Sequence, residues 1–413
     1  MPIATRRRKA ALWVGAVALL LVVGAGIVWW GFTRGWFDPG SVEGTSVGFE
    51  PGDAPAADAG SHSWPEYGFD ARRTRANPRL ALAPPFDTAW TFDAGSLVEF
   101  PPVIADGRAV VGTNAGLAIA LDVTTGQEQW RVPLRGRVAS SPALSGELAL
   151  FTTIRGDLIA LRAATGAEVW RRKIGSPVES SPLVVDDTVF IGTLGQRVMR
   201  LDARTGGVLW NVPAGGQVKA SLAVAGPNVV VGDYAGRVTA FRRTDGKVVW
   251  DTASPGGALR GSGRFYGGPA VAYGRVFIGN INGRVLALDR DSGQIAWVRL
   301  LDDYVYASPA IAGRLVYVGS YDHRLYALDA VTGAVKWSFD AGERISGSAS
   351  VVGDVVYVST LAKDPSKGRT FGLDAASGKR VLTFPDGRYS PAVGVDGILV
   401  MTGVRTLYGL TPR

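Results

Sequence analysis

Val316-Tyr-Val-Gly-Ser320, Arg324-Leu-Tyr-Ala-Leu-Asp329 and Thr332-Gly-Ala-Val-Lys-Trp337 are consecutive pieces of one repeat unit, and this unit decides the fold. The first two pieces are short runs of β-branched, aromatic and other apolar residues, which are typical of strands. Between the second and third pieces, Asp329 can bond nearby backbone amides and Gly333 can supply the positive φ of a tight turn. No part of the unit shows helical periodicity. The unit therefore predicts short antiparallel strands joined by turns.

Tryptophan recurs along the chain at an interval of forty residues in five cases and of forty-seven in one. The recurring residues are Trp90, Trp130, Trp170, Trp210, Trp250, Trp297 and Trp337. Glycine stands four positions before six of them, at Gly126, Gly166, Gly206, Gly246, Gly293 and Gly333. A repeat of this length that holds only strand-forming segments predicts the blades of a β-propeller. Each tryptophan is expected to dock blades together by burying roughly 150–250 Å² between them.

The sequence contains eight segments that can each form the innermost strand of a blade, so eight blades are predicted. These strands are expected near Pro102, Pro142, Pro182, Leu222, Pro269, Pro309, Ala349 and Pro391. The chain ends after the third strand of the last unit, and the strand Thr88–Asp93 has no unit before it. We therefore predict that Thr88–Asp93 pairs with Thr406–Leu410, which closes the ring and removes an open sheet edge. The seventh unit departs from the pattern, because Leu382 stands where tryptophan is expected.

The fold class predicted is thus all-β, an eight-bladed β-propeller of four-stranded antiparallel blades over residues 64–413, preceded by one N-terminal transmembrane helix. Residues 1–9 are a basic tail with Arg6-Arg7-Arg8-Lys9, and residues 10–32 carry no charge. A helix over these 23 residues spans about 34 Å, enough to cross a hydrocarbon core of about 30 Å. The basic flank predicts a cytoplasmic tail, a single-pass signal anchor in the cell membrane and a propeller outside the cytoplasm. A cleaved signal peptide is the alternative, but its apolar region is usually shorter.

Residues 33–63 are rich in proline, glycine and alanine and lack apolar periodicity. This composition predicts a flexible linker that holds the propeller off the bilayer. Of the net charge of +8, five positive charges lie in residues 1–37, so the propeller is nearly balanced and nucleic acid is not expected as a partner. The chain has no cysteine, which excludes disulfides, thiol chemistry and a lipid attached to cysteine.

Two segments carry a resemblance to a known family. The motif Leu-Asp-x-x-Thr-Gly-x-x-x-Trp, present at Leu201–Trp210 and Leu328–Trp337, resembles the tryptophan-docking repeat of pyrroloquinoline-quinone (PQQ) propellers. The run Trp64-Pro-Glu-Tyr-Gly-Phe-Asp70 resembles the lead-in segment of these proteins. The resemblance covers about residues 64–413 and implies the propeller fold. The family contains quinoprotein dehydrogenases, the outer-membrane assembly scaffold BamB and sensor domains, so the resemblance does not select one activity.

The enzyme branch of the family implies chemistry that is not evident in this sequence. Quinoprotein alcohol dehydrogenases carry a catalytic aspartate, a Ca²⁺ ion and usually a vicinal cysteine pair, and this chain has no cysteine. Calcium takes six to eight oxygen ligands, whereas the acidic doublets Asp186-Asp187 and Asp302-Asp303 are more simply surface turns. His62 lies in the linker and His323 in a turn. We therefore predict no catalytic, cofactor-binding or metal-binding residues and no cofactor.

The scaffold branch is the preferred interpretation: a non-enzymatic, BamB-like protein-binding propeller in the cell envelope. The alternatives are a PQQ-dependent dehydrogenase-like enzyme and a ligand-sensing propeller. BamB is a lipoprotein, so the absence of cysteine and the predicted helical anchor depart from it. Two long loops, residues 254–264 and 361–369, account for the main deviations in repeat length. Both loops fall on the face that holds the fourth-to-first and second-to-third connections of a four-stranded blade, and both are basic.

A rim that includes these loops is the predicted binding site for a protein partner, because aromatic and arginine side chains commonly anchor interfaces. Its residues are Arg260, Arg264, Tyr266, Tyr304, Tyr306, Tyr321, Lys363, Lys367 and Arg369. Tolerated variation in loop length is the alternative interpretation.

One position at the start of every innermost strand predicts a ring around the channel mouth. The ring is Glu99, Ala139, Glu179, Lys219, Tyr266, Tyr306, Ser346 and Arg388. We expect pairing between Glu179 and Lys219 and between Arg388 and Glu99, with Tyr266 beside Tyr306. Pairing between blades is preferred over ligand binding for this ring.

Overall fold

The computed structural model describes residues 40–54, 63–256, 263–389 and 391–413. The predicted tail and anchor, residues 1–32, and part of the predicted linker lie outside these ranges. Within the ranges, no helix is long and apolar enough to cross a membrane.

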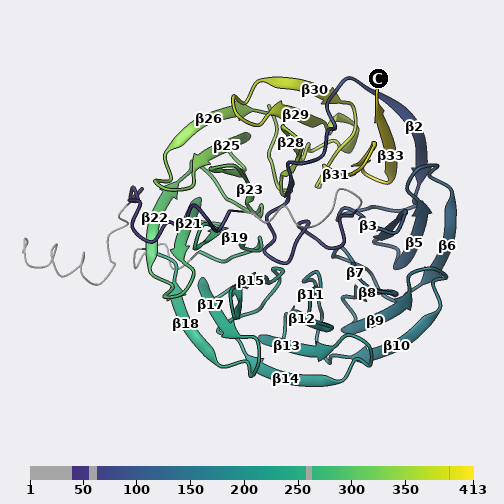
Figure 1. The fold of residues 1–413 in the computed structure, drawn as a ribbon, viewed down its shortest axis with the longest axis horizontal. Coiled ribbons are helices and arrows are strands. Elements are labelled where there is room, and N and C mark those ends of the chain that lie inside the picture. Colours follow the sequence, from purple (N-terminus) through teal and green to yellow (C-terminus); the bar gives the residue numbers. More distant parts are fainter. Residues whose placement is uncertain (1–39, 55–62, 257–262, 390) are drawn as a thin grey trace, which may run out of the picture.

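The described residues form eight sheets arranged as the blades of a closed ring (Figure 1). Each blade contributes four antiparallel strands, so the predicted eight-bladed, all-β propeller is confirmed. Each innermost strand begins one residue after the position expected for it. These strands are β3 (Val103–Ala105), β7 (Ala143–Ser145), β11 (Leu183–Val185), β15 (Ala223–Ala225), β19 (Ala270–Ala272), β23 (Ala310–Ala312), β27 (Ser350–Val352) and β31 (Ala392–Val395).

The second and third strands of the blades are the most completely buried. The second strands are β4 (Arg108–Gly112), β8 (Leu148–Thr152), β12 (Thr188–Thr193), β16 (Asn228–Gly232), β20 (Arg275–Gly279), β24 (Leu315–Gly319), β28 (Val355–Ser359) and β32 (Ile398–Thr402). The third strands are β5 (Leu117–Asp122), β9 (Asp157–Arg162), β13 (Arg197–Asp202), β17 (Arg237–Arg242), β21 (Arg284–Asp289), β25 (Arg324–Asp329), β29 (Thr370–Asp374) and β33 (Thr406–Pro412).

The fourth strands form the outer edge of the ring. They are β6 (Glu128–Pro133), β10 (Glu168–Lys173), β14 (Val208–Pro213), β18 (Val248–Ala253), β22 (Ile295–Leu300), β26 (Val335–Asp340), β30 (Arg380–Phe384) and, for the eighth blade, β2 (Phe86–Asp93). A short strand, β1 (Ala76–Asn77), runs parallel to β27, and one 3-10 helix, η1 (Pro365–Lys367), lies in a loop of the seventh blade.

The eighth blade joins the two ends of the propeller. Strand β2 pairs antiparallel with β33, with Thr88 opposite Leu410 and Asp93 opposite Thr406. Figure 1 shows β2 (blue) beside β33 (yellow), and these colours mark the N-terminal and C-terminal parts of the propeller. The predicted pairing of the two strands is therefore confirmed, and the ring has no open blade edge between its first and last units.

Each repeated tryptophan docks its blade on the next one. Trp297 on β22 donates its indole N–H to the carbonyl of Ala330 in the following blade, at 3.1 Å. Gly333 of the same turn has a φ of +73°, and a Cβ there would lie 2.7 Å from the Trp297 ring. The glycine is thus required twice, for the turn and for the close approach of the indole. The equivalent indole bonds of the other tryptophans reach Val123, Ala163, Ala203, Arg243, Arg290 and Ala375.

The closure explains why the seventh blade has Leu382 where the other blades have tryptophan. A tryptophan there would dock on the turn between the third and fourth strands of the eighth blade. That turn does not exist, because those strands are β33 and β2, from opposite ends of the propeller. Leu382 instead packs, half-buried, against the closing core.

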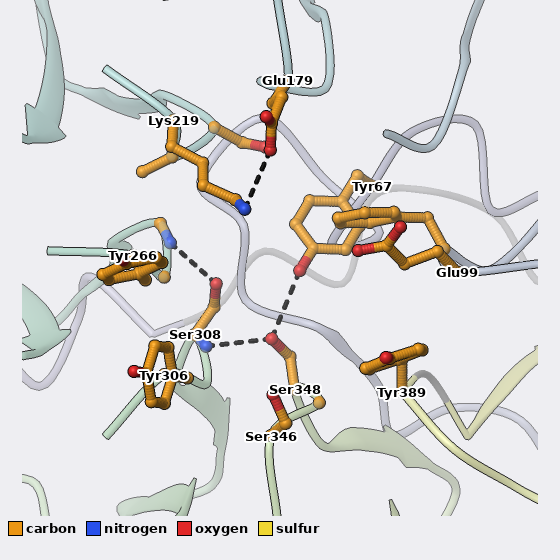
Figure 2. A pocket seen from close by; sticks show the side chains of 16 residues that line it. Tyr67, Glu99, Glu179, Lys219, Tyr266, Tyr306, Ser308, Ser346, Ser348 and Tyr389 are labelled. Carbon is orange, nitrogen blue, oxygen red and sulfur yellow. Dashed lines mark hydrogen bonds and ion pairs between the residues drawn. The ribbon is translucent and has the colours of Figure 1, made fainter. Parts of the chain in front are cut away.

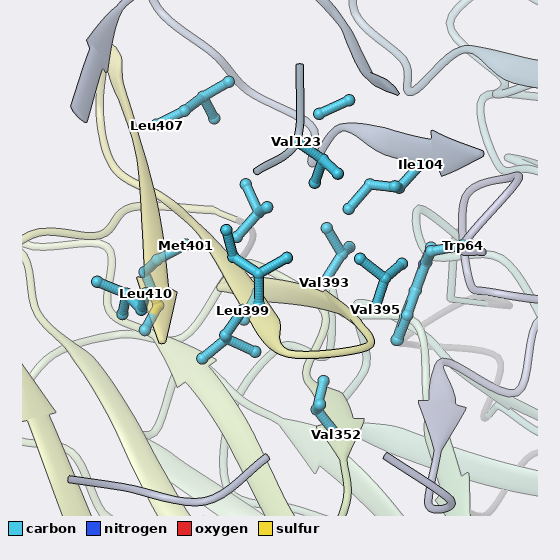
Figure 3. Packing of buried hydrophobic residues seen from close by; sticks show 14 of the residues in the cluster. Trp64, Ile104, Val123, Val352, Val393, Val395, Leu399, Met401, Leu407 and Leu410 are labelled. Carbon is cyan, nitrogen blue, oxygen red and sulfur yellow. The ribbon is translucent and has the colours of Figure 1, made fainter. Parts of the chain in front are cut away.

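The hydrophobic core lies between neighbouring blades. The largest cluster joins blades seven, eight and one, and Figure 3 shows members from both ends of the propeller, among them Ile104, Val123, Leu399 and Leu407. Burial of apolar side chains contributes roughly 25 cal/mol for each Å² removed from water. The contact that closes the ring therefore also buries the apolar core between these blades.

An axial segment, residues 64–77, runs around the centre of the ring (Figure 1, purple). Seven inner strands each present a free N–H toward the axis, and the segment accepts these bonds at 2.7–3.3 Å. The donors are Ile104, Leu144, Val184, Val224, Val271, Ile311 and Val351. Unpaired N–H groups on an inner strand edge would be costly if buried without an acceptor. The lead-in segment therefore caps the inner edges of seven blades.

Arg73 holds the axial segment in place from a fully buried position. Its guanidinium donates to Glu66 at 3.1 Å and to the carbonyls of Leu222 and Pro182 at 3.0 and 2.9 Å. Burial raises the pKa of Glu66 to about 7, while the cation of Arg73 opposes the rise. The bonds of one side chain thus tie the segment to the third and fourth blades.

Residues 40–54 form an N-terminal arm against the fifth and sixth blades. Val42 bridges Val298 on β22, and the buried Arg275 donates to the carbonyl of Thr45 at 2.7 Å. The carboxylate of Asp53 contacts Arg72 at 2.7 Å and Arg290 at 3.0 Å. The prediction of a flexible linker is therefore wrong for residues 40–54, because specific backbone and ionic contacts hold a segment that lacks apolar periodicity.

The closure generates a first prediction. Deleting residues 404–413 removes β33 and leaves β2 without its partner, so the melting temperature of the whole propeller should fall by well over 5 °C, or folding should fail. Deleting Arg413 alone removes an exposed ion pair with Asp87 and one backbone hydrogen bond to Pro85 but leaves the rest of β33 in place, and serves as the control. Thermal melts followed by circular dichroism measure both. An unchanged melting temperature after the longer deletion would contradict the closure.

Blade docking generates a second prediction, tested by two matched glycines. Gly333→Ala places a methyl group against Trp297, whereas Gly397, with a φ of +76°, has no atom within 4 Å of its would-be Cβ. Both substitutions incur the strain of positive φ, about 1–2 kcal/mol. Only Gly333→Ala adds overpacking, typically about 1–3 kcal/mol. Urea unfolding should therefore show a larger loss for Gly333→Ala, and equal losses would argue against the docking role.

Candidate protein-binding face

One face of the ring carries the second long loop and the described ends of the first, whose residues 257–262 lie outside the described residues. On this face, the second-to-third-strand turns bond to the connections that lead into the innermost strands. Tyr321 N donates to Tyr304 O at 3.0 Å, and Leu361 N donates to Arg344 O at 2.6 Å. We call this the mouth face, because the channel opens on it.

The two long loops place their basic residues differently. Within the first loop, Arg260 lies outside the described residues, and Arg264 is exposed. In the second loop, Lys363 and Lys367 are exposed around η1. Arg369 is half-buried and donates to the carbonyls of Ser366 and Gly368 at 3.3 and 2.8 Å. Arg369 thus braces its own loop, while the two lysines are available to a partner.

Five tyrosines form a continuous arc across blades four to six. Ring centroids lie 4.6 Å apart for Tyr234 and Tyr266, 4.8 Å for Tyr266 and Tyr306, and 4.6 Å for Tyr306 and Tyr321. Tyr304 contacts both Tyr306 and Tyr321 and is 48% exposed. The predicted tyrosines are therefore brought together, and their outer member is open to solvent.

Tyr234 is the member of the arc that sequence reasoning missed. It occupies the same position in the second-to-third-strand turn of blade four that Tyr321 occupies in blade six, since each donates its N–H to the preceding connection. Aligning these turns, as well as the innermost strands, would have found it.

Cations flank the tyrosine arc at both ends. Arg264 lies 5.8 Å from the ring centroid of Tyr234, and Arg344 lies 5.5 Å from that of Tyr321. Such cation–π contacts hold a guanidinium over a ring while leaving its N–H groups free to bond elsewhere. Because the carbonyl of Arg344 also accepts from Leu361, the arc connects one long loop with the other.

The channel mouth is a cavity of about 130 Å³ beside the arc (Figure 2). Lys219 pairs with Glu179 at 2.8 Å, which confirms one predicted contact between blades. Among the described residues, Arg388 and Glu99 form no ion pair within 4.0 Å, so that predicted contact is wrong. Burial raises the pKa of Glu99, and among the cations that oppose this rise Lys219 has the largest effect.

The floor of the mouth is polar and is closed by the axial segment. Figure 2 shows Tyr67 pointing into the cavity, where its hydroxyl lies 3.2 Å from the Ser348 hydroxyl. Ser348 also accepts from the N–H of Ser308 at 2.9 Å, and Ser308 accepts from Gly268 at 2.8 Å. These bonds tie blades five, six and seven together at the floor of the mouth.

The residues at the mouth do not fit PQQ with its calcium ion. The cavity of about 130 Å³ is below the roughly 300 Å³ at which small-molecule sites begin. Glu179 is already bonded to Lys219, and no group of three or more His, Asp or Glu side chains in the described part of the chain is arranged to hold a metal. Calcium requires six to eight oxygen ligands.

Comparisons with known proteins agree with this architecture. A family model described as "Outer membrane protein assembly factor BamB" matches residues 81–153, 142–263 and 255–387. No curated protein matches the chain. BamB from Moraxella catarrhalis superposes with a TM-score of 0.67 at 17% identity, covering 79% of this chain and 100% of that one.

Two dehydrogenases are similar to about the same degree. Quinohemoprotein alcohol dehydrogenase from Comamonas testosteroni gives a TM-score of 0.73 at 18% identity, covering 86% of this chain and 81% of that one. A europium-containing methanol dehydrogenase gives 0.71 at 15% identity, covering 85% and 91%. At such identities the likeness shows the shared fold alone. The family match spans most of the propeller, and the chain belongs to the PQQ-like β-propeller family whose model is described as outer membrane protein assembly factor BamB.

Proposed function

We propose that the chain is a non-enzymatic protein-binding scaffold, held at the cell membrane by residues 10–32 with its propeller outside the cytoplasm. The observation that carries the proposal is the tyrosine arc between two basic loops on one rigid face. Binding residues are commonly presented on loops of a rigid scaffold. A partner protein is the ligand that a broad face of this kind fits.

The chemistry of the mouth face supports a protein partner. Tyrosine and arginine bury large area and can bond at their tips, so they dominate the strongest positions of protein interfaces. Tyr304 is half exposed, and Arg264 and Lys363 are exposed beside the arc. The loop cations would also speed association with an acidic partner, and this effect would weaken as salt rises.

Partner capture tests the proposal. In membranes treated with a crosslinker, a variant with Arg264→Glu and Tyr304→Ala should capture the partner about tenfold less than the unmodified chain, since truncated anchor residues often cost over 1 kcal/mol each. Arg162→Glu with Arg204→Glu, which alters exposed arginines on the opposite face, is the control. Capture that survives the first variant and disappears in the control would show that the wrong face was chosen.

Cofactor binding tests the enzyme alternative directly. Calorimetric titration with PQQ, with and without Ca²⁺, should give no stoichiometric binding, and a dye-linked assay should show no alcohol oxidation. The reasons are the small mouth cavity and the pairing of Glu179 with Lys219. A quinone site of micromolar affinity would instead support the dehydrogenase interpretation.

A further inference from the structure

A second concavity on the mouth face lies beside the tyrosine arc, between the sixth and seventh blades. This groove has a volume of about 600 Å³. One wall is the turn that carries His323, and the other is the start of the long loop at Leu361–Lys363. Tyr389 lines both this groove and the channel mouth, so the two concavities adjoin.

Three cations line the groove without carboxylate partners. Arg344, Lys363 and Arg388 form no ion pair with any acidic side chain of the described ranges. By contrast, Arg290 on the fifth blade contacts three carboxylates, those of Glu50, Asp53 and Asp291. The groove therefore carries three cations against one lining carboxylate, that of Glu343, and Arg388 also exerts a longer-range effect on Glu99.

Two of the three cations are held in place by aromatic rings. Arg344 lies 5.5 Å from the ring centroid of Tyr321, and Arg388 lies 5.3 Å from that of Tyr389. The Nε atom of Arg388 is buried and has no hydrogen-bond partner in the described structure. The Nε atom is thus enclosed by the protein, and the part of Arg388 that lines the groove is left for a ligand. Positioning by rings lowers the entropy lost when such a side chain binds.

We propose that this groove binds an extended acidic segment of the partner protein, an inference that rests on the proposed scaffold function and names the chemistry of what docks. Carboxylates of the segment would bond Arg344 and Lys363 at the rim and Arg388 inside, and its end would point toward the channel mouth. Arginine presents a planar fork of donors that matches a carboxylate.

The groove favours a peptide over a membrane surface or a polyphosphate. Glu343 also lines it and would repel a densely charged polyanion, while a peptide can place its acidic residues away from that carboxylate. A bilayer is flat and cannot enter a groove between two raised turns. The three cations therefore fit carboxylates spaced along one chain.

The experiment measures the binding of labelled peptides to the full chain in detergent by fluorescence anisotropy. The probe is a peptide of alternating glutamate and serine, compared with peptides of glutamine and serine and of lysine and serine. The acidic peptide should bind at least about tenfold more tightly than the other two, and its affinity should fall between about 50 and 300 mM NaCl. Equal binding of the acidic and glutamine peptides would overturn the proposal.

A pair of variants locates the binding. Arg344→Glu, Lys363→Glu and Arg388→Glu together should weaken acidic-peptide binding at least about tenfold. Arg344→Gln, Lys363→Gln and Arg388→Gln should weaken it less, and this milder variant keeps the test valid if the first fails to fold. The charge-matched control reverses three exposed arginines of the same face on blades one and two, Arg135, Arg137 and Arg155, and should change affinity less than about twofold.

The remaining outcomes separate the two proposals. An equal loss of peptide binding in the groove variant and in the control would mean that only net charge matters, which contradicts the groove. Tighter binding of the chain to vesicles of equal parts phosphatidylglycerol and phosphatidylcholine, lost in the groove variant, would assign the groove to lipid instead. Peptide binding without partner capture would count against the proposed function alone, and capture without peptide binding would count against the groove alone.

Discussion

The contact on which the whole ring depends is the docking of a tryptophan from one blade on a glycine turn of the next. The indole lies against the glycine and donates its N–H to a carbonyl of the same turn, as Trp297 does with Gly333 and Ala330. A blade alone could not bury its faces, so each contact stabilises two blades at once. The same rule explains why the seventh blade carries Leu382, since the turn that a tryptophan there would need is replaced by the junction of the two chain ends.

The inner strands of such a ring have unpaired N–H groups that face its axis. The axial segment supplies hydrogen-bond acceptors for them. Residues 64–77 accept the free N–H groups of seven inner strands, and Arg73 fixes them from a buried position. Tyr67 of this segment forms part of the polar floor of the mouth cavity. The side chains that the mouth face exposes around this cavity are tyrosines and cations.

The sequence was sufficient for the fold because the repeat period and the turn glycines are local and regular. The pairing of Thr88–Asp93 with Thr406–Leu410 was also predictable, because it leaves no strand of the ring unpaired. The axial segment and the N-terminal arm were not predictable in the same way. Their bonds are made by backbone carbonyls and by single residues such as Asp53, which leave no periodic pattern in the sequence. At the mouth, Glu179 and Lys219 form the ion pair expected of opposite charges on neighbouring blades. The guanidinium of Arg388 instead lies over the ring of Tyr389 and forms no ion pair with Glu99 in the described structure.

The central claim is that a partner protein meets the mouth face, and a photocrosslinking amino acid placed at two sites tests it most directly. Tyr304 on the mouth face and Leu209 on the outer edge of the third blade are 48% and 51% exposed, so accessibility does not favour either site. The account predicts a crosslinked adduct in membranes when the photocrosslinker replaces Tyr304 and none when it replaces Leu209. An adduct at Leu209 with none at Tyr304 would contradict the account.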